Sequence, residues 1–331
     1  MTTVERIYDR TGAKRWLALA NLCVPIDHPG LIGNSLDEVL HQLSGEQESA
    51  RYAHFVAIDD GVDVGYGTAR LPLRDNLSGA NVSMSVLPSH RRRGVGTALA
   101  SEILAYVQSE GRTNAIWTVG SPLEHNSPGY DFSRAMGATG VLSRLRRELD
   151  LSLVNKRELD TLVKVVVDQR DRDYQIVTWV DRAPNDFVEG VARLVGRMST
   201  DTPRGDLTWE PEVWDARRWR EKEEDAHLSG RRRFAAGAAD RAGNLVAFSD
   251  IGAWVHDPRV AEQWNTIVDP DHRGHRLGLA VKIANLRNVR RELPWARLET
   301  WNADENTRMV AINELLGFQV VERVDEFQLV M

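Results

Sequence analysis

The chain has 331 residues, of which 42% are hydrophobic and 27% are charged, which is typical of a globular protein with enough apolar residues for two cores. The net charge of −6 argues against nucleic acid as a main partner, and the single cysteine, Cys23, excludes an internal disulfide framework. No apolar segment approaches the ~20 residues that span a bilayer and the N-terminus lacks a signal-peptide pattern, so we expect a cytoplasmic protein with no membrane partner.

Apolar periodicity in the first 152 residues predicts alternating strands and helices. The turn Asp59-Asp60-Gly61 joins two apolar runs and indicates a hairpin. Further along, apolar residues recur at helical spacing after a basic turn. In chain order we expect strands at 3–8, 52–58, 62–71, 81–87, 114–119 and 141–151, and helices at 12–23, 94–109 and 128–136.

The second half of the chain repeats this order of elements. We expect strands at 174–180, 231–240, 244–254, 263–268, 297–301 and 319–330, and helices at 185–198, 276–290 and 305–316. The charged segment between the halves, with interspersed aliphatic residues, predicts a linker helix. The domains are therefore expected at 1–152 and 173–331, with the linker helix at 153–172.

A motif occurs twice and fixes the register of the repeat. The segment 86–96 matches 268–278, so that Pro88 and Pro270 lie 182 positions apart (270 − 88). A second landmark, Gly137 in the first copy and Gly317 in the second, keeps nearly the same spacing of 180 (317 − 137). Two long segments whose landmarks keep one offset are two copies of one fold.

The repeated motif is a strand, a basic turn with glycine, and the start of a helix. Such a turn directs several free backbone N–H groups toward one point, where the helix dipole adds positive charge. Glycines let a phosphate come close to the backbone, and arginines at the rim add charge-assisted hydrogen bonds. The segment Arg91-x-x-Gly94-x-Gly96 therefore predicts a pyrophosphate site that is neither a Walker loop nor a dinucleotide fingerprint.

Both halves resemble the GNAT superfamily of N-acetyltransferases. The resemblance rests on a strand, the turn Val-x-Pro-x-x-Arg-x-x-Gly-x-Gly, a helix, a strand and a short helix that ends in Leu316-Gly317-Phe318. The two-copy arrangement is similar to that of two-domain actinobacterial members of the mycothiol-synthase type. The resemblance implies an α/β (α+β) fold of two tandem GNAT domains, each with a mixed, mostly antiparallel sheet flanked by helices.

The resemblance also implies acetyl-CoA as the acyl donor. Its pyrophosphate would bind backbone amides of the basic turn, and its pantetheine arm would pair with the preceding strand as an added strand does. In the first copy the implied binding residues are Val86, Leu87, Arg91, Arg92, Arg93, Gly94, Val95, Gly96 and Thr97. In the second copy they are Ile267, Val268, Asp269, Arg273, Gly274, His275, Arg276, Leu277, Gly278, Leu279 and Asn302.

Two positions depart from the family pattern. Arg276 stands where the first copy has Gly94, which puts close approach to the backbone at that position in doubt. The family commonly has a tyrosine four residues before the glycine of Leu-Gly-Phe, where it reprotonates the thiolate. This chain has Asn313 there in the second copy and Ser133 in the first, so water or another group such as Tyr130 would have to serve.

We expect catalysis in the second copy, with the first either binding a second CoA or serving as scaffold. The candidate catalytic residues are Glu299, Asn306 and Asn313. Glu299 closes a strand beside the expected acetyl site and could take a proton from the acceptor, although an ordinary salt-bridged strand end also explains it. His272 and His275 lack metal-ligand spacing, so no metal is expected.

The predicted function is transfer of acetyl from acetyl-CoA to a primary amine of a small molecule by direct attack. Two alternatives stay open: a non-catalytic acyl-CoA-binding protein with a regulatory or structural role, and an enzyme that acetylates proteins or peptides. Segment 206–230, predicted in the second copy alone, contains three tryptophans and is either a solvated insertion helix or a wall of the acceptor pocket. A homodimer is compatible with the sequence.

Overall fold

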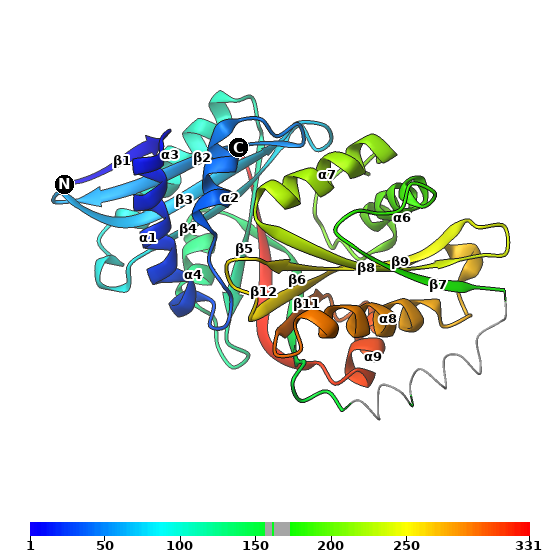
Figure 1. The fold of residues 1–331 in the computed structure, drawn as a ribbon. Coiled ribbons are helices and arrows are strands. Elements are labelled where there is room, and N and C mark those ends of the chain that lie inside the picture. Colours follow the sequence, from blue (N-terminus) through cyan, green and yellow to red (C-terminus); the bar gives the residue numbers. More distant parts are fainter. Residues whose placement is uncertain (156–160, 162–172) are drawn as a thin grey trace. The chain divides into compact units, whose positions relative to one another are not determined.

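The computed structural model describes residues 1–155, 161 and 173–331, which fall into two compact units (Figure 1). Unit 1 contains Met1–Arg144, Arg204–Glu210 and Glu322–Met331. Unit 2 contains Leu145–Pro203 and Pro211–Val321. The predicted linker helix at 153–172 lies largely outside the described residues.

Unit 1 is a sheet with helices on both faces. Its strands follow the order β1-β2-β3-β4-β5-β12. They are β1 (Thr2–Ile7), β2 (Ala50–Asp59), β3 (Val62–Pro72), β4 (Gly79–Val86), β5 (Asn114–Ser121) and β12 (Gln319–Val330). The helices are α1 (Arg10–Asp27), α2 (Leu36–Ser44), η1 (Pro88–His90), α3 (Val95–Ser109) and α4 (Pro128–Ala135).

Unit 2 repeats this architecture with the strand order β6-β11-β10-β9-β8-β7. Its strands are β6 (Thr139–Asp150), β7 (Gln175–Val180), β8 (Arg231–Ala239), β9 (Leu245–Trp254), β10 (Val260–Val268) and β11 (Arg297–Asn302). Its helices are α6 (Val188–Asp201), α7 (Ala216–Leu228), η2 (Pro270–His272), α8 (Leu277–Glu292) and α9 (Thr307–Leu315). In each unit the sheet is mixed and mostly antiparallel, as the sequence predicts.

Apolar residues alternate along the strands of unit 1 and build a core on each face of the sheet. On one face α3 packs through Leu99 and Ile103 against Phe55 of β2. On the other face α1 packs through Trp16 and α2 through Val39. The face that α3 covers is the one on which its N-terminus meets the end of β4.

The same two-faced packing occurs in unit 2. On one face α8 packs against β8 and β9, joined at one end by Leu316 and Phe318 from the segment after α9. On the other face α6 and α7 pack against the sheet, with Trp219 of α7 fully buried. The expectation that 206–230 is an insertion confined to the second copy is wrong, because α7 occupies the place in element order that α2 has in unit 1.

The last strand of each sheet comes from the other copy of the repeat, so the sheets do not divide at residue 152. β12 pairs antiparallel with β5 of unit 1, from Arg323↔Ser121 to Val330↔Asn114. β6 pairs antiparallel with β11 of unit 2, from Asn302↔Leu145 to Arg297↔Asp150. Each sheet is therefore completed by a strand that the repeat assigns to the other copy.

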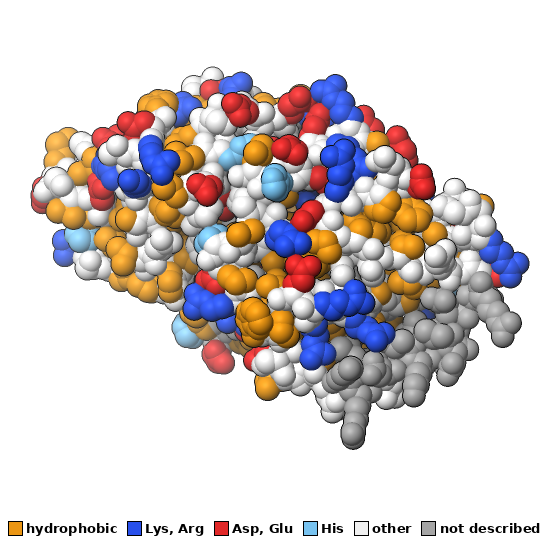
Figure 2. All heavy atoms as spheres, viewed as in Figure 1, with side chains coloured by type: hydrophobic (Ala, Val, Ile, Leu, Met, Phe, Trp, Pro, Cys, Tyr) orange, Lys and Arg blue, Asp and Glu red, His pale blue; other side chains and the backbone are white. Residues whose placement is uncertain are grey.

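The displayed face of the molecule shows basic and acidic side chains intermingled (Figure 2). Within the described residues, no helix is both long and apolar enough to cross a bilayer. Across the same residues, no group of three His, Cys, Asp or Glu side chains could hold a metal ion.

Candidate active site

The basic turns of the two copies adopt the same backbone path with different residues. In the first turn, Arg92 and Gly94 take left-handed conformations with φ of 63° and 85°. In the second turn the corresponding residues are Gly274 and Arg276, with φ of 90° and 55°. The glycine and the arginine have exchanged places while the left-handed bends remain. Arg276 thus keeps the backbone path of the turn although it carries a side chain where the first copy has glycine.

Both turns lead into helices whose first amides lack side-chain caps. The first helical hydrogen bonds run from the Ala98 N–H to the Gly94 carbonyl in α3 and from the Ala280 N–H to the Arg276 carbonyl in α8. No side chain of the described residues caps either helix at Gly94 or Arg276. The preceding amides, together with the helix dipole, are groups that can donate hydrogen bonds to an anion. We call residues 92–97 the first cradle and residues 274–279 the second cradle.

A diphosphate fits the chemistry of either cradle. The glycine of the first helical turn lies against the strand and the short helix in both units. A Cβ built on Gly96 would lie 3.5 Å from Phe132, and one built on Gly278 would lie 3.5 Å from Val268. A side chain larger than that of alanine at either position would therefore have to displace this neighbour.

Some arginines of the turns are paired within the protein, and others show no ion pair. Arg91 donates to Asp27 at the end of α1 at 2.6 Å and to the Val86 carbonyl at 2.8 Å. Arg273 repeats this brace with Asp201 at 2.6 Å and the Val268 carbonyl at 3.3 Å. These two side chains fix the turn to its strand and are already paired. Arg92, Arg93 and Arg276 are also exposed, and the described part of the chain shows no ion pair for them.

The two histidines beside Arg273 pack on a tyrosine. Tyr174 shares a hydrogen bond of 2.9 Å with His272, and its ring also contacts His275. Both histidines thereby belong to the packing under the second cradle. Asp269, at the end of β10, accepts a hydrogen bond from Arg193.

In each unit two parallel strands separate below the cradle. β4 and β5 pair only from Gly79↔Asn114 to Asn81↔Ile116. β10 and β11 pair only from Val260↔Arg297 to Glu262↔Glu299. Beyond these pairs the strands diverge, so the edge amides and carbonyls of β4 and β10 are available to an extended arm.

Only the strand of unit 2 is bulged at this opening. The pairing of β10 with β9 shifts by one residue between Gln263 and Thr266, whereas β4 pairs with β3 without a shift. Asp250 of β9 holds the bulge, because its Oδ1 accepts from the backbone N–H of Asn265 at 2.8 Å and from the side-chain amide at 2.9 Å. A bulge redirects backbone groups next to a site.

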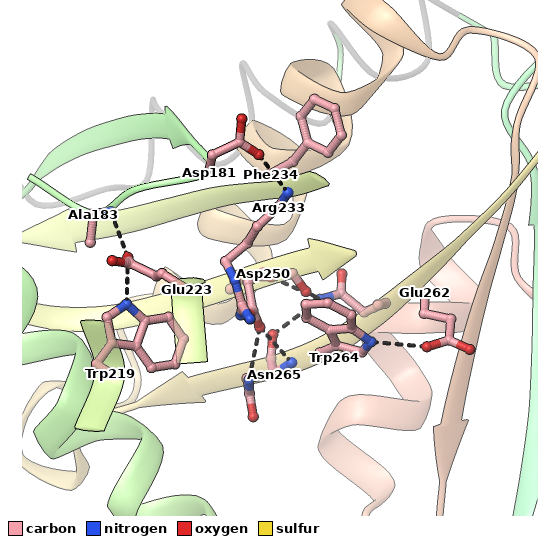
Figure 3. A network of polar contacts seen from close by, with 12 residues as sticks. Asp181, Ala183, Trp219, Glu223, Arg233, Phe234, Asp250, Glu262, Trp264 and Asn265 are labelled. Carbon is pink, nitrogen blue, oxygen red and sulfur yellow. Dashed lines mark hydrogen bonds and ion pairs between the residues drawn. The ribbon is translucent and has the colours of Figure 1, made fainter. Parts of the chain in front are cut away.

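Figure 3 shows that Asp250 belongs to a buried network behind the bulge. Its other oxygen pairs with Arg233, whose guanidinium lies between the rings of Trp219 and Trp264 at 4.8 and 4.6 Å from the centroids. Glu223 of α7 accepts from Trp219 at 2.8 Å. Trp264 lies flat over β9 because residue 252 is glycine, where a Cβ would come within 2.0 Å of its ring. The network makes the bulge rigid, and Trp219 is a core residue.

Glu299 is a buried carboxylate at the mouth of the opening. Its Oε1 accepts from Arg146 at 3.2 Å and from Arg297 at 3.1 Å, and its Oε2 has no hydrogen-bond partner among the described residues. Burial raises the pKa of Glu299 to about 7, although the two arginines oppose the shift. Leu298 packs on the α8 side, so Glu299 faces the α6 and α7 side.

Lys282, Asn302 and Asn313 form a polar cluster on the face of the unit 2 sheet that α8 covers. The sequence did not point to Lys282. Lys282 of α8 donates to Asn313 Oδ1 at 2.8 Å, and Asn313 Nδ2 donates to Asn302 Oδ1 at 2.5 Å. Asn306 is the N-cap of α9, where its side chain accepts from the Met309 N–H at 3.4 Å. Of the predicted catalytic residues, Asn313 thus lies beside Asn302, whereas Glu299 lies on the opposite face and Asn306 caps a helix.

The corresponding positions of unit 1 lack these groups. Ala100 stands in α3 where α8 has Lys282, and Ile116 stands in the last pair before the opening where unit 2 has Glu299. Ser133 is buried, accepts from Trp117 at 2.7 Å and donates to the Gly129 carbonyl at 2.8 Å. Its hydroxyl is therefore engaged inside unit 1.

The chain is similar in sequence and in fold to known proteins. The family model for the acetyltransferase (GNAT) family matches residues 26–136. A mycothiol acetyltransferase from Mycobacterium sp. (strain JLS) is 27% identical over 296 residues, which cover 86% of this chain and 84% of the relative. A solved tandem GNAT protein from the clavulanic acid biosynthesis pathway superposes with a TM-score of 0.80 at 25% identity, covering 100% of this chain and 98% of that one. These matches support a tandem GNAT N-acetyltransferase.

The match with another relative covers almost the whole chain. The mycothiol acetyltransferase of Mycolicibacterium smegmatis is 25% identical, and the match covers 97% of this chain and 97% of the relative. The resemblance found in the sequence and the fold class are thereby confirmed, and the protein is an acyltransferase of the superfamily whose members use acetyl-CoA. The family model falls in the first copy, whereas the bulge and the buried carboxylate lie in the second.

Proposed function

We propose that this tandem GNAT acetyltransferase transfers acetyl from acetyl-CoA to the primary amine of a small molecule, and that the reaction takes place in unit 2. The observation that carries the proposal is the bulge of β10. It lies in the same unit as an uncapped helix start, a strand opening and the buried Glu299. Unit 1 has the cradle and the opening but has neither the bulge nor the carboxylate.

The second cradle would hold the diphosphate of the donor. The amides of 274–279 supply the hydrogen bonds, and the exposed guanidinium of Arg276 adds charge at the rim. The edge of β10 from Ile267 to Asp269 would pair with the pantetheine arm, which leads the thioester to the bulge. A backbone N–H of β10 would then polarise the thioester carbonyl.

The acceptor would approach from the side of the sheet that Glu299 faces. A carboxylate whose pKa is about 7 can accept a proton from an ammonium group near neutral pH. Because the side chain of Glu299 is fully buried, the proton would pass through a water molecule. The amine nitrogen then attacks the carbonyl carbon directly, and the thiolate of CoA departs.

The names of the relatives direct the choice of acceptors. Several are called mycothiol acetyltransferases, and one solved neighbour comes from the clavulanic acid pathway. At 25–28% identity this chain shares their fold, but this level of identity does not fix the acceptor. A panel should therefore contain amines of the mycothiol type, other small polar amines and peptides with free N-termini.

The deciding experiment combines thiol release from acetyl-CoA with calorimetric titration of CoA. Arg276→Glu and Arg92→Glu are matched variants, because both residues are exposed and both already take left-handed conformations. We expect Arg276→Glu to weaken CoA binding in unit 2 and to lower turnover at least tenfold, through repulsion of the diphosphate. Arg92→Glu should leave turnover within about twofold.

The opposite pattern would overturn the assignment to unit 2. Loss of turnover in Arg92→Glu with normal turnover in Arg276→Glu would place the chemistry in unit 1. Binding of CoA without turnover on every amine of the panel would favour a regulatory or structural role. Turnover on peptides alone would favour a protein or peptide acceptor.

A further inference from the structure

Lys282 is a buried cation that the proposed reaction does not yet use. It lies one turn beyond Gly278 in α8, its residue is 2% exposed, and burial lowers its pKa to about 7. Nζ donates to Asn313 Oδ1 at 2.8 Å and lies 3.9 Å from Met309 Sδ and 5.4 Å from the centroid of the Phe318 ring. The described residues show no carboxylate paired with it.

The lysine fixes the direction of a chain of hydrogen bonds. An ammonium group only donates, so Asn313 must present Oδ1 to Lys282 and its Nδ2 to the other side. That Nδ2 donates to Asn302 Oδ1 at 2.5 Å, which turns the N–H groups of Asn302 outward. Hydrogen bonds arranged head to tail polarise one another, and here a positive charge stands at the start of the chain.

The chain of hydrogen bonds ends at Asn302, in the opening between β10 and β11. Asn302 is the last residue of β11, three residues beyond the last parallel pair at Glu299, and its side chain is partly exposed. Across the opening lies the bulge of β10. An arm that runs from the second cradle along β10 brings its thioester between the bulge and Asn302.

The fold itself does not require the lysine. Ala100 occupies the same place in α3, which begins at an equivalent cradle and packs on an equivalent sheet. A buried charge without a counterion costs stability, so a lysine at this position calls for a reason outside packing.

We propose that Lys282 is a positioning residue that, through Asn313 and Asn302, directs an N–H donor and positive charge at the sulfur of the departing CoA. This inference rests on the proposed function. As the amine nitrogen bonds to the acetyl carbon, the C–S bond breaks and its electron pair stays on sulfur. The ammonium proton passes through water to Glu299, the acylated nitrogen releases its second proton to solvent, and the sulfur takes a proton from solvent.

The test measures the thiol of bound CoA and needs no acceptor. The ultraviolet absorbance of the thiolate is followed against pH in the wild type, in Lys282→Met and in Lys282→Ala, the residue that unit 1 carries. All three are made in an Arg92→Glu background, which removes CoA bound in unit 1. We expect the wild-type thiol to titrate at a lower pH than free CoA, because the nearby thiolate favours the protonated form of Lys282 and is stabilised by it in turn, and both variants to lose this shift.

The outcomes separate this inference from the proposed function. If CoA binds all three proteins and its thiol titrates at the same pH in each, Lys282 has only a structural role and the proposal fails, while the acetyltransferase assignment stands. If CoA does not bind unit 2 of the wild type, both fail. Unfolding midpoints in urea, measured alongside, show that the variants are folded.

Discussion

The two units keep the same cradle but differ in the groups that surround it. The left-handed bends persist although glycine and arginine have exchanged places, because the cradle uses backbone amides. Groups that act through side chains have not persisted: Glu299, Lys282 and Asp250 of unit 2 correspond to Ile116, Ala100 and Thr68 of unit 1. The backbone path of the turn thus tolerates sequence change, whereas the side chains around it differ between the units.

The positions of Asp250 and Thr68 explain why one strand bulges and the other does not. Thr68 shares a 2.9 Å hydrogen bond with His54 on β2 and faces Ser83 in regular register. Asp250 instead accepts two bonds from Asn265, which an unshifted strand would not place there. These two hydrogen bonds and the ion pair with Arg233 offset the cost of burying the Asp250 carboxylate.

The largest effect is expected from Asp250→Ala. It leaves the guanidinium of Arg233 buried without its partner, and we expect the free energy of unfolding to fall by about 3–5 kcal/mol. The matched change, Thr68→Ala, removes one neutral hydrogen bond and should cost about 1 kcal/mol. Urea unfolding followed by tryptophan fluorescence measures both, and equal costs would contradict the contrast between the units.

Glu299→Gln should lower kcat about 100-fold on any acceptor that the panel identifies. In the wild type, kcat should rise with pH through about 7 as Glu299 loses its proton, and the variant should lack this limb. Arg146 and Arg297 keep Glu148 as a partner, so the fold should persist. Glu148→Gln is the control, and a limb that disappears in that variant as well would count against Glu299 as the base.

Lys282→Met should make the protein more stable at pH 7, by about 2 kcal/mol. The pKa of Lys282 is about 7 in the folded protein and 10.5 as its ordinary value, so between these pH values the unfolded chain binds more protons. Wild-type stability therefore rises with pH, and the advantage of the variant should shrink by about 1.4 kcal/mol per pH unit. Unfolding in urea at pH 7.5 to 9 checks this, with the exposed Lys14→Met as control; a constant advantage would be the contrary result.

The smallest effect is expected from Gly96→Ala and Gly278→Ala. Each new Cβ meets its nearest neighbour at an ordinary contact distance of 3.5 Å, so both variants should gain about 0.5 kcal/mol from helix propensity. If only the second cradle serves the reaction, only Gly278→Ala should raise the KM for acetyl-CoA. A matched rise in both variants would indicate that the cradles cooperate.

Much of the fold could be predicted because the motif occurs twice and fixes two sets of elements at once. The helix α2 was missed, although Ser35 and Glu38 form an N-terminal signature in which the Ser35 hydroxyl accepts from the Glu38 N–H at 3.0 Å. The closing strands could not be assigned, since β6 and β12 have similar patterns and sequence does not say which sheet a strand joins.

The basic turns could be located from sequence, whereas the side-chain groups below them could not. Lys282 reads as an exposed position in a helix, and only the structure shows that Asn313 and Phe318 enclose it. The bulge of β10 depends on the register against β9, which a single strand does not reveal. Arg91 and Arg273 were expected at the phosphate, and the structure pairs them with Asp27 and Asp201.

The closing strands also govern when each half can fold during synthesis. The sheet of unit 1 needs β12, which leaves the ribosome only after the whole of unit 2 has been made. An emerging N-terminal half therefore exposes the edge of β5 for the time that the ribosome takes to add the second copy, a state that favours chaperone capture or pairing with a foreign strand. Separating the gene between the copies would leave each fragment without the strand that closes its sheet in the whole protein.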